Sequence, residues 1–446
     1  MGGAHIWREA HIWLDAFDNS QRNRPCEAVR RHLMDKLYII MVGLPARGKS
    51  TIALRLFQSL SEEGVRTRIF NNGELRRARL GPESSHPLFY HPDNREAREK
   101  REELAKLNAR EAQAFLAANG QVAILDAANA SLQRRRHLRE MLTDHPILFV
   151  ECVNEDKDLL EASIERKTRL PEFSYISKEE AIASFKERMS YYERMFCPLQ
   201  NEGSYIRVDT LRNDILEEKL TDTIPLYIPI RDVLVTNWVK ELFLVRHGES
   251  YFNIENRIGG DASLTPKGRR QAFELAEYFQ GRQIPYIFTS QRVRALETAA
   301  PLAAAHPEAV EITLPELDEI NAGRCEGMRY EDISREMPEV FDSRQRNKYN
   351  YAYPEGESYA VMRQRVERGF RKAMFLSGGQ SGVMLIGHQA VNRLILSLFL
   401  YRRTEDVPYI YVPQNQFFHI VMTHRTKLFD RIPYTDAFNT PPASSL

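Results

Sequence analysis

The segment Gly43-Leu44-Pro45-Ala46-Arg47-Gly48-Lys49-Ser50 constrains the fold of this chain more than any other feature. It follows an apolar run at 37–42 that predicts a fully buried strand, and it precedes a segment of helical composition that continues to about Leu60. A glycine-rich turn between such a strand and a helix is typical of parallel α/β sheets, in which backbone N–H groups and the helix N-terminus bind phosphate. The first half of the chain is therefore expected to be an α/β domain with a phosphate-binding loop.

This loop predicts a site for ATP with Mg²⁺. The amine of Lys49 is expected to reach the β- and γ-phosphates, while the Ser50 hydroxyl ligates the metal. Asp126 follows the apolar run 122–125 and is the second predicted metal ligand, with a helix N-cap as the alternative role. The predicted nucleotide-binding residues are Gly43, Ala46, Arg47, Gly48, Lys49, Ser50 and Thr51.

Basic clusters in the same half are candidates for holding an anionic acceptor. Each cluster alone is more typical of a solvated surface, but their number in a chain of formal net charge +1 favours a phosphorylated acceptor. The clusters are Arg76-Arg77, Arg101, Arg134-Arg135-Arg136 and Lys167.

The second half begins a new α/β pattern with the apolar run 242–245, which ends in Arg246-His247-Gly248-Glu249. A second histidine, His388, also follows an apolar run. Neutral imidazole beside arginine is suited to nucleophilic attack on phosphorus, because the guanidinium stabilises the phosphoryl oxygens. Either histidine alone could be a core residue, but the two together with Arg246 favour a phosphatase that forms phosphohistidine.

The alternation of strands and helices predicts two α/β domains, with a boundary near residue 238. We assign 36–238 to the kinase domain and 239–446 to the phosphatase domain, with 1–35 as an N-terminal extension. The extension is expected to be a short amphipathic helix, or alternatively a regulatory or dimer-stabilising arm. Further strands are expected at 65–70, 121–125, 146–152, 284–289 and 382–386, helices at 95–119 and 179–195, and a helix with a connector at 213–238.

The second half resembles the histidine phosphatase superfamily, which has the phosphoglycerate mutase-like fold. The motifs that carry this resemblance are Arg246-His247-Gly248-Glu249, Asn253, Arg257-Ile258-Gly259-Gly260, Arg294 and His388. With the preceding phosphate-binding loop, residues from about 36 to 435 resemble the bifunctional 6-phosphofructo-2-kinase/fructose-2,6-bisphosphatase family. The resemblance implies synthesis of fructose 2,6-bisphosphate from ATP and fructose 6-phosphate, and its hydrolysis through phosphohistidine.

The resemblance also implies roles for residues in the phosphatase half. His247 is implied as the nucleophile and Glu319 as the acid that protonates the leaving oxygen. Arg246, Asn253, Arg294 and His388 are implied to hold the transferred phosphoryl group. The implied contacts to the rest of the bisphosphate are Arg257, Gly259, Tyr330, Arg344, Lys348, Tyr359, Gln389 and Arg393.

In the kinase half, the resemblance implies that Lys49 and Lys167 stabilise the transferred phosphoryl group. The implied fructose 6-phosphate ligands are Arg76, Arg77, Arg101, Arg188 and Tyr192. The chain departs from the family at Ala128, where a threonine is expected, and at Ala162-Ser163, where an asparagine is expected. Each missing hydrogen bond to a charged partner costs about 1.5–3 kcal/mol, which weakens the kinase without abolishing it.

The nearly neutral composition predicts that the binding partners are small molecules. The chain has 446 residues and a nearly balanced charge, so neither a nucleic-acid nor a membrane partner is predicted. Four widely spaced cysteines predict a reducing cytoplasm rather than disulfides or a metal site. No cofactor is expected in the phosphatase domain, and a homodimer is an open possibility. The alternatives are a kinase–phosphatase fusion that acts on another sugar phosphate or on a nucleic-acid end, and a regulatory protein with one inactive site.

Overall fold

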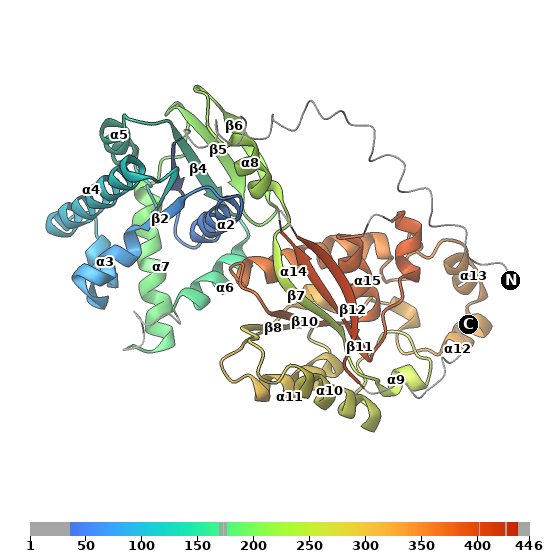
Figure 1. The fold of residues 1–446 in the computed structure, drawn as a ribbon. Helices are drawn as coiled ribbons and strands as arrows, with labels where there is room; N and C mark the ends of the chain where they lie inside the picture. Colours follow the sequence, from blue (N-terminus) through green and yellow to red (C-terminus); the bar gives the residue numbers. More distant parts are fainter. Residues whose placement is uncertain (1–35, 169–172, 174–175, 401, 424–425, 436–446) are drawn as a thin grey trace, which may run out of the picture.

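The structure is a computed structural model that describes residues 36–435, apart from 169–172, 174–175, 401 and 424–425 (Figure 1). The expected N-terminal extension, 1–35, lies outside the described residues. The chain folds into two α/β domains, each built around a six-stranded sheet. Among the described helices, none has the length and apolarity needed to cross a membrane.

The first sheet has the order β2-β3-β1-β4-β5-β6, and its first five strands are parallel. All six residues of the central strand β1 are buried, as their apolar side chains require. The edge strand β6 is antiparallel to β5 and occupies part of the segment expected to be a helix and connector, so that expectation was wrong there. The strands are β1 (Leu37–Val42), β2 (Thr67–Asn71), β3 (Val122–Asp126), β4 (Ile147–Val153), β5 (Ser204–Asp209) and β6 (Asp214–Lys219).

Helices cover both faces of this sheet. Apolar residues of α2 and α8 pack on one face, and those of α4 and α5 pack on the other. Polar side chains begin several of these helices, as at Asn94, whose Oδ1 accepts a hydrogen bond from Ala97 N and caps α4. The helices are α2 (Lys49–Glu62), α3 (Asn72–Leu80), α4 (Arg95–Ala118), α5 (Leu132–Met141), α6 (Lys157–Thr168), α7 (Lys178–Met195) and α8 (Tyr227–Val235).

The second sheet has the order β12-β11-β7-β10-β8-β9. Its strands β7, β10, β8 and β9 are parallel, while β11 and β12 extend the sheet as antiparallel strands beyond β7. The strands are β7 (Val239–Arg246), β8 (Tyr286–Thr289), β9 (Val310–Thr313), β10 (Val383–Gly387), β11 (Gln416–Met422) and β12 (Lys427–Pro433).

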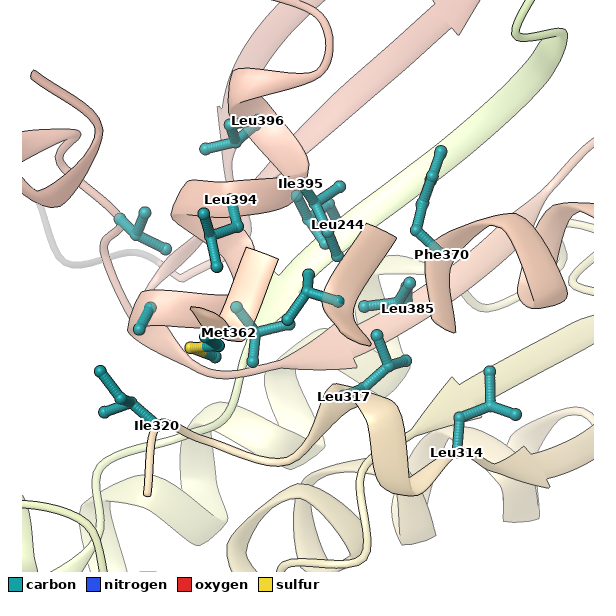
Figure 2. Packing of buried hydrophobic residues seen from close by; sticks show 14 of the residues in the cluster. Leu244, Leu314, Leu317, Ile320, Met362, Phe370, Leu385, Leu394, Ile395 and Leu396 are labelled. Atoms are coloured by element: carbon teal, nitrogen blue, oxygen red, sulfur yellow. The ribbon is translucent and has the colours of Figure 1, made fainter. Parts of the chain in front are cut away.

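Helices also cover both faces of the second sheet. Apolar residues of α10 and α11 fill one face. On the other face, side chains from β7, β10, α14, α15 and the segment 314–320 converge in one cluster (Figure 2). The helices are α9 (Tyr251–Ile254), α10 (Pro266–Tyr278), α11 (Val293–Ala305), α12 (Tyr330–Glu336), α13 (Pro338–Arg346), α14 (Tyr359–Leu376) and α15 (Gln389–Ser397).

The two domains share part of their apolar core. Helix α6 of the first domain lies beside α14 of the second at the junction (Figure 1). Leu159 of α6 is 1% exposed and belongs to the same cluster as Phe370 and Phe375 of α14. Because buried side chains of both domains belong to one cluster, the junction is a packed interface rather than a loose linker. Such burial contributes about 25 cal/mol per Å² of apolar surface to stability.

Candidate active sites

The loop after β1 has the backbone geometry of a phosphate cradle. The φ angles of Gly43, Ala46 and Gly48 are 136°, 62° and 84°, in the region that favours glycine. A Cβ on Gly43 would lie 2.6 Å from the carbonyl oxygen of Cys152, so a side chain cannot be placed there. The predicted loop therefore forms where the sequence places it, between β1 and α2.

Lys49 lies at the centre of the N-terminal site. Its Nζ donates to the carbonyl oxygen of Leu44 at 2.6 Å. Burial lowers the pKa of Lys49 to about 8, the nearby Asp126 carboxylate opposes this shift, and the positive charges of Lys167 and Arg188 add to it. Asp126, Lys167 and Arg188 therefore all lie close enough to Lys49 to act on its charge. An anion bound among these residues would stabilise the charged form of the Lys49 amine.

Asp126 is held by a residue that sequence reasoning missed. Parallel pairing of β2 and β3 puts Asn71 opposite Asp126, and Asn71 Nδ2 donates to Asp126 Oδ2 at 2.6 Å. Asn71 Oδ1 accepts from the backbone N of Gly73, so it also caps α3. The alternative role of Asp126 as a helix cap was wrong, because Ser131 caps α5. An asparagine at a strand end before a helix was the signal that could have revealed Asn71.

Basic residues of the predicted acceptor site gather around Tyr90, which the sequence analysis did not select. The guanidinium carbons of Arg76, Arg101 and Arg188 lie 5.5, 5.3 and 4.1 Å from the centre of its ring. The ring of Tyr192 lies 5.7 Å away. Tyr90 is 3% exposed, and its hydroxyl has no hydrogen-bond partner among the residues that the structure describes. Three cations around one buried ring form a site suited to a phosphorylated acceptor.

Other candidate arginines serve structural contacts. Arg134 donates to both carboxylate oxygens of Glu102, at 2.8 and 2.6 Å. Arg135 is fully buried and forms a two-point ion pair with Glu202. Arg77 is partly exposed in the last turn of α3. Arg134 and Arg135 therefore hold helices rather than an anion.

The two histidines of the C-terminal site follow neighbouring parallel strands. Register pairing of Arg246 with Gly387 puts His247 and His388 side by side, with ring centres 5.1 Å apart. His247 Nδ1 lies 2.7 Å from the carbonyl oxygen of Gly248, which assigns the proton to Nδ1. His388 Nε2 lies 2.7 Å from the hydroxyl oxygen of Ser290. Burial, aided by nearby arginines, lowers the pKa of both histidines well below 6.5.

Cationic and polar side chains surround His247. Arg294 Nε donates to His247 Nε2 at 3.2 Å. Arg246 NH1 donates to the carbonyl oxygen of Val412, while its buried Nε has no hydrogen-bond partner in the described part of the chain. Asn253 Oδ1 accepts from Ser250 and Gln414, which orients its amide. The unpartnered Arg246 Nε is a donor that a phosphoryl oxygen would satisfy.

The loop that carries Glu319 is fixed by Arg365, which forms an ion pair with Glu357. Arg365 of α14 donates to the carbonyl oxygens of Glu316, Asp318 and Glu319 at 2.9, 2.7 and 3.2 Å. Glu357 holds this guanidinium with both oxygens, each at 2.7 Å. Glu319 Oε1 itself accepts from Ala390 N at 3.3 Å. Sequence analysis missed Arg365, since a helical arginine carries no motif of its own.

Other predicted sugar-phosphate ligands lie near one another. Arg393 NH1 donates to the hydroxyl of Tyr359 at 3.1 Å. Lys348 lies 4.9 Å from the ring centre of Tyr409, and burial, with Arg344 and Arg393 nearby, lowers its pKa to about 8. Gln389 begins α15, directly after His388. Tyr330 interacts electrostatically with Arg246, so these two predicted site residues lie near each other.

Arg257 and Gly259 lie in a loop that is held by hydrogen bonds to the carboxylates of Glu255 and Glu326. Arg257 Nε donates to Glu255 at 2.5 Å, and its NH1 donates to the carbonyl oxygen of Gly327. A Cβ on Gly259 would lie 2.4 Å from Glu326 Oε2, and the φ of 64° at this residue lies in the region that favours glycine. The structure gives Gly259 a role in the loop backbone.

Comparisons with known proteins agree for both halves. The histidine phosphatase superfamily (branch 1) matches residues 242–433, and the 6-phosphofructo-2-kinase family matches residues 26–231. Among solved structures, Bacillus stearothermophilus YhfR matches over 43% of this chain and 95% of its own, at 26% identity and a TM-score of 0.40.

Relatives with both domains cover nearly the whole chain. A 6-phosphofructo-2-kinase/fructose-2,6-bisphosphatase of Gallus gallus is 34% identical over 389 residues, which span 84% of this chain and 80% of the relative. The 6-phosphofructo-2-kinase/fructose-2,6-bisphosphatase 1 of Homo sapiens is 31% identical over 425 residues, spanning 93% and 88%. The chain belongs to the bifunctional 6-phosphofructo-2-kinase/fructose-2,6-bisphosphatase family.

Proposed function

We propose that this chain both synthesises and hydrolyses fructose 2,6-bisphosphate. The observation that carries the proposal is the presence of two built phosphate sites in one chain, the loop around Lys49 and the histidine pair His247 and His388. The kinase domain is assigned to 36–238 and the phosphatase domain to 239–446. The two family matches, at 26–231 and 242–433, support this division.

The kinase reaction depends on positioning and charge. The loop N–H groups and Lys49 hold the ATP phosphates, while Arg76, Arg101 and Arg188 hold the phosphate of fructose 6-phosphate near Tyr90. The oxygen of the sugar 2-hydroxyl attacks the γ-phosphorus, the bond from that phosphorus to the bridging oxygen of ADP breaks, and the hydroxyl proton is released to water. Lys49 and Lys167 then offset the negative charge on the transferred group.

ATP enters this site as its Mg²⁺ complex. Asp126 fits the metal because its carboxylate oxygens are the ligand type that Mg²⁺ prefers and because Asn71 orients it. Ser50 is the second residue of α2, directly after Lys49 at the end of the loop. Mg²⁺ would neutralise charge on the β- and γ-phosphates. The residues of the chain orient the two substrates toward each other.

The phosphatase reaction begins with attack by His247. Its Nδ1–H donates a hydrogen bond to the carbonyl oxygen of Gly248, so Nε2 carries the lone pair and is the nucleophile. Nε2 bonds to the phosphorus of the 2-phosphate, the bond from that phosphorus to the sugar oxygen breaks, and Glu319 gives that oxygen a proton. Arg246, Arg294 and His388 hold the phosphoryl oxygens.

A water molecule then completes the hydrolysis. Glu319, now a carboxylate, takes a proton from this water. The water oxygen attacks the phosphorus of the phosphohistidine, the bond from phosphorus to Nε2 breaks, and inorganic phosphate is released. The sugar remains as fructose 6-phosphate. The phosphatase residues supply the positive charge, the nucleophile and the acid, and we propose that this domain uses no cofactor.

The location and assembly of the chain are also proposals. The thiols of Cys152, Cys197 and Cys325 are free, which supports a reducing cytoplasm. A homodimer is proposed as the assembly, and sedimentation velocity at several concentrations tests it.

The decisive experiment measures both reactions with purified chain. ATP and fructose 6-phosphate should yield fructose 2,6-bisphosphate in wild type and not in Lys49→Met, and hydrolysis should continue in that variant. Other sugar phosphates and nucleic-acid ends, offered with labelled ATP, test the alternative substrates. Preference for one of them would contradict the proposal, and so would the absence of either activity.

A further inference from the structure

Helix α14 of the phosphatase domain contacts both active sites. Near its N-terminal end, Tyr359 accepts a hydrogen bond from Arg393, and Arg365 holds the loop of Glu319. Near its C-terminal end, Phe375 reaches the kinase domain. The helix has 18 residues. It is about 27 Å long at about 1.5 Å per residue, long enough to join the two sites directly.

Phe375 lies against the last glycine of the ATP loop. A Cβ built on Gly48 would lie 2.9 Å from Phe375 Cε2 and 3.0 Å from Thr210 Oγ1. Thr210 Oγ1 in turn lies 3.0 Å from the carbonyl oxygen of Arg47 and 3.2 Å from that of Val153. The backbone that precedes Lys49 is therefore held between a ring of one domain and a hydroxyl of the other.

Arg368 of α14 makes a second contact with the kinase domain, in the segment between β4 and α6 that touches the ATP loop through Arg47. It donates to Asp156 Oδ2 at 3.0 and 2.8 Å, across the domain junction. The backbone N of Asp156 donates to Asn154 Oδ1, and the carbonyl oxygen of Asn154 accepts from Arg47. The Asp156 side chain is 10% exposed and that of Arg368 is 49% exposed, so only the carboxylate side of this ion pair is shielded from solvent.

We propose that Phe375 is a positioning residue for the kinase reaction, supplied by the phosphatase domain. Its ring limits the space behind Gly48, so the loop N–H groups and Lys49 keep the geometry that binds the phosphates of ATP. Arg368 supports the same loop through Asp156 and Asn154. The inference rests on the proposed kinase function and adds to it that ATP affinity depends on the other domain.

The test compares Phe375→Ala and Phe375→Leu in the full chain. Loss of the ring leaves a cavity behind Gly48, so Phe375→Ala should raise the KM for ATP and the Kd for MgATP about tenfold. Leucine refills most of the space and should keep both constants within about threefold of wild type. The KM for fructose 6-phosphate and the rate of bisphosphate hydrolysis should stay within about twofold, which also shows that α14 remains folded.

Phe418→Ala is the matched control. Phe418 is another buried ring of the phosphatase core, 4% exposed, and it packs on Phe429 of β12 rather than on the ATP loop. This variant should lower the melting temperature without changing the Kd for MgATP. Equal weakening of MgATP by Phe375→Ala and Phe418→Ala would overturn the inference, as would normal affinity in folded Phe375→Ala.

Calorimetry with MgATP alone separates this inference from the proposed function. If the wild-type chain binds MgATP and makes no fructose 2,6-bisphosphate, the acceptor assignment is wrong while the role of Phe375 is still decided by the binding constants. If the wild-type chain binds no MgATP, both the kinase function and the role of Phe375 are overturned.

Discussion

Arg294 Nε donates a hydrogen bond to His247 Nε2 at 3.2 Å, so a permanent cation faces the lone pair of the proposed nucleophile. A protonated imidazole would place a second positive charge at that point. This contact agrees with the lowered pKa of His247, for which burial is the main cause and Arg294 and Arg246 add to the effect. The same guanidinium is in position to receive phosphoryl oxygens once attack begins.

His247 is therefore expected to stay neutral as the pH falls through its ordinary value of 6.5. A lowered pKa means that the proton binds only at still lower pH, so the nucleophile remains available in mildly acidic solution. Nuclear magnetic resonance of ring-labelled histidine, assigned by loss of one signal in His247→Ala, should show no titration of His247 between about pH 8 and about pH 6. A titration centred near 6.5 would contradict this.

Arg365→Met should slow hydrolysis of fructose 2,6-bisphosphate about 10- to 100-fold by displacing the loop of Glu319. The KM should change little, because Arg365 touches backbone carbonyl oxygens rather than the sugar. An aryl phosphate with a good leaving group needs no proton, so its hydrolysis should fall much less. Arg363→Met, two residues earlier on α14, serves as the control and should retain both rates.

If Arg365→Met slows both substrates equally, its effect is on folding rather than on the acid. Glu319→Gln gives the reference pattern, since it removes the acid and keeps the shape of the side chain. The two variants should share the same ratio of rates on the two substrates.

Lys348 should make bisphosphate binding depend on pH in the alkaline range. Burial and the charges of Arg344 and Arg393 lower its pKa to about 8. The amine is charged below that value and loses its charge as the pH rises through it, so the KM for fructose 2,6-bisphosphate should rise above about pH 8. Lys348→Arg keeps its charge and should flatten the KM profile, and an identical profile in wild type and variant would rule out Lys348 as the cause.

The sequence was sufficient for the parts of the sites that local patterns specify. Buried strands followed by Gly43–Ser50 and by Arg246-His247 fix where the chemistry lies, because parallel strands end at one edge of a sheet. Asn71, Tyr90 and Arg365 could not be found in this way. Each acts through a contact between segments distant in sequence, and its residue type alone is consistent with an ordinary cap, core ring or surface charge.

Contacts between distant segments also explain two wrong expectations, one about a strand and one about an anion site. The segment 214–219 is strongly polar, and its strand β6 exists only because β5 offers an open edge for antiparallel pairing. The basic run at Arg134 and Arg135 suggested anion binding, but Glu102 and Glu202 lie opposite them in space. Partners brought together by tertiary folding therefore decide what a charged residue does.

Ala128→Thr should tighten fructose 6-phosphate binding. Ala128 is partly exposed beside the ATP loop, and its carbonyl oxygen accepts from Gly43 N at 3.0 Å. A hydroxyl there can donate to the sugar phosphate, which is worth about 1.5–3 kcal/mol and should lower the KM about tenfold or more. Ala128→Val adds the same bulk without the hydroxyl and should not lower the KM. Equal effects of threonine and valine would show that bulk alone is responsible.

Tyr90→Leu should impair the kinase much more than Tyr90→Phe. The ring lies 5.5, 5.3 and 4.1 Å from the guanidinium carbons of Arg76, Arg101 and Arg188, and each cation–π contact contributes about 0.5–2 kcal/mol. Phenylalanine keeps these contacts, whereas leucine removes them and lets the three like charges repel one another into other positions. Initial rates at saturating ATP should give a KM for fructose 6-phosphate raised about 10- to 100-fold in Tyr90→Leu and about threefold at most in Tyr90→Phe.

The matched pair also tests the hydroxyl of Tyr90, which is buried and finds no hydrogen-bond partner in residues 36–435 as far as they are described. If the acceptor satisfies this hydroxyl, Tyr90→Phe should show a loss of about 0.5 kcal/mol, the lower end of the range for one neutral hydrogen bond, which raises the KM about two- to threefold. Hydrolysis by the phosphatase domain should be unchanged in both variants, because Tyr90 contacts only residues of the kinase domain among the described aromatic and cationic neighbours. Equal KM values in Tyr90→Leu and Tyr90→Phe would show that the ring does not organise the arginines, and the acceptor site would then have to be sought elsewhere.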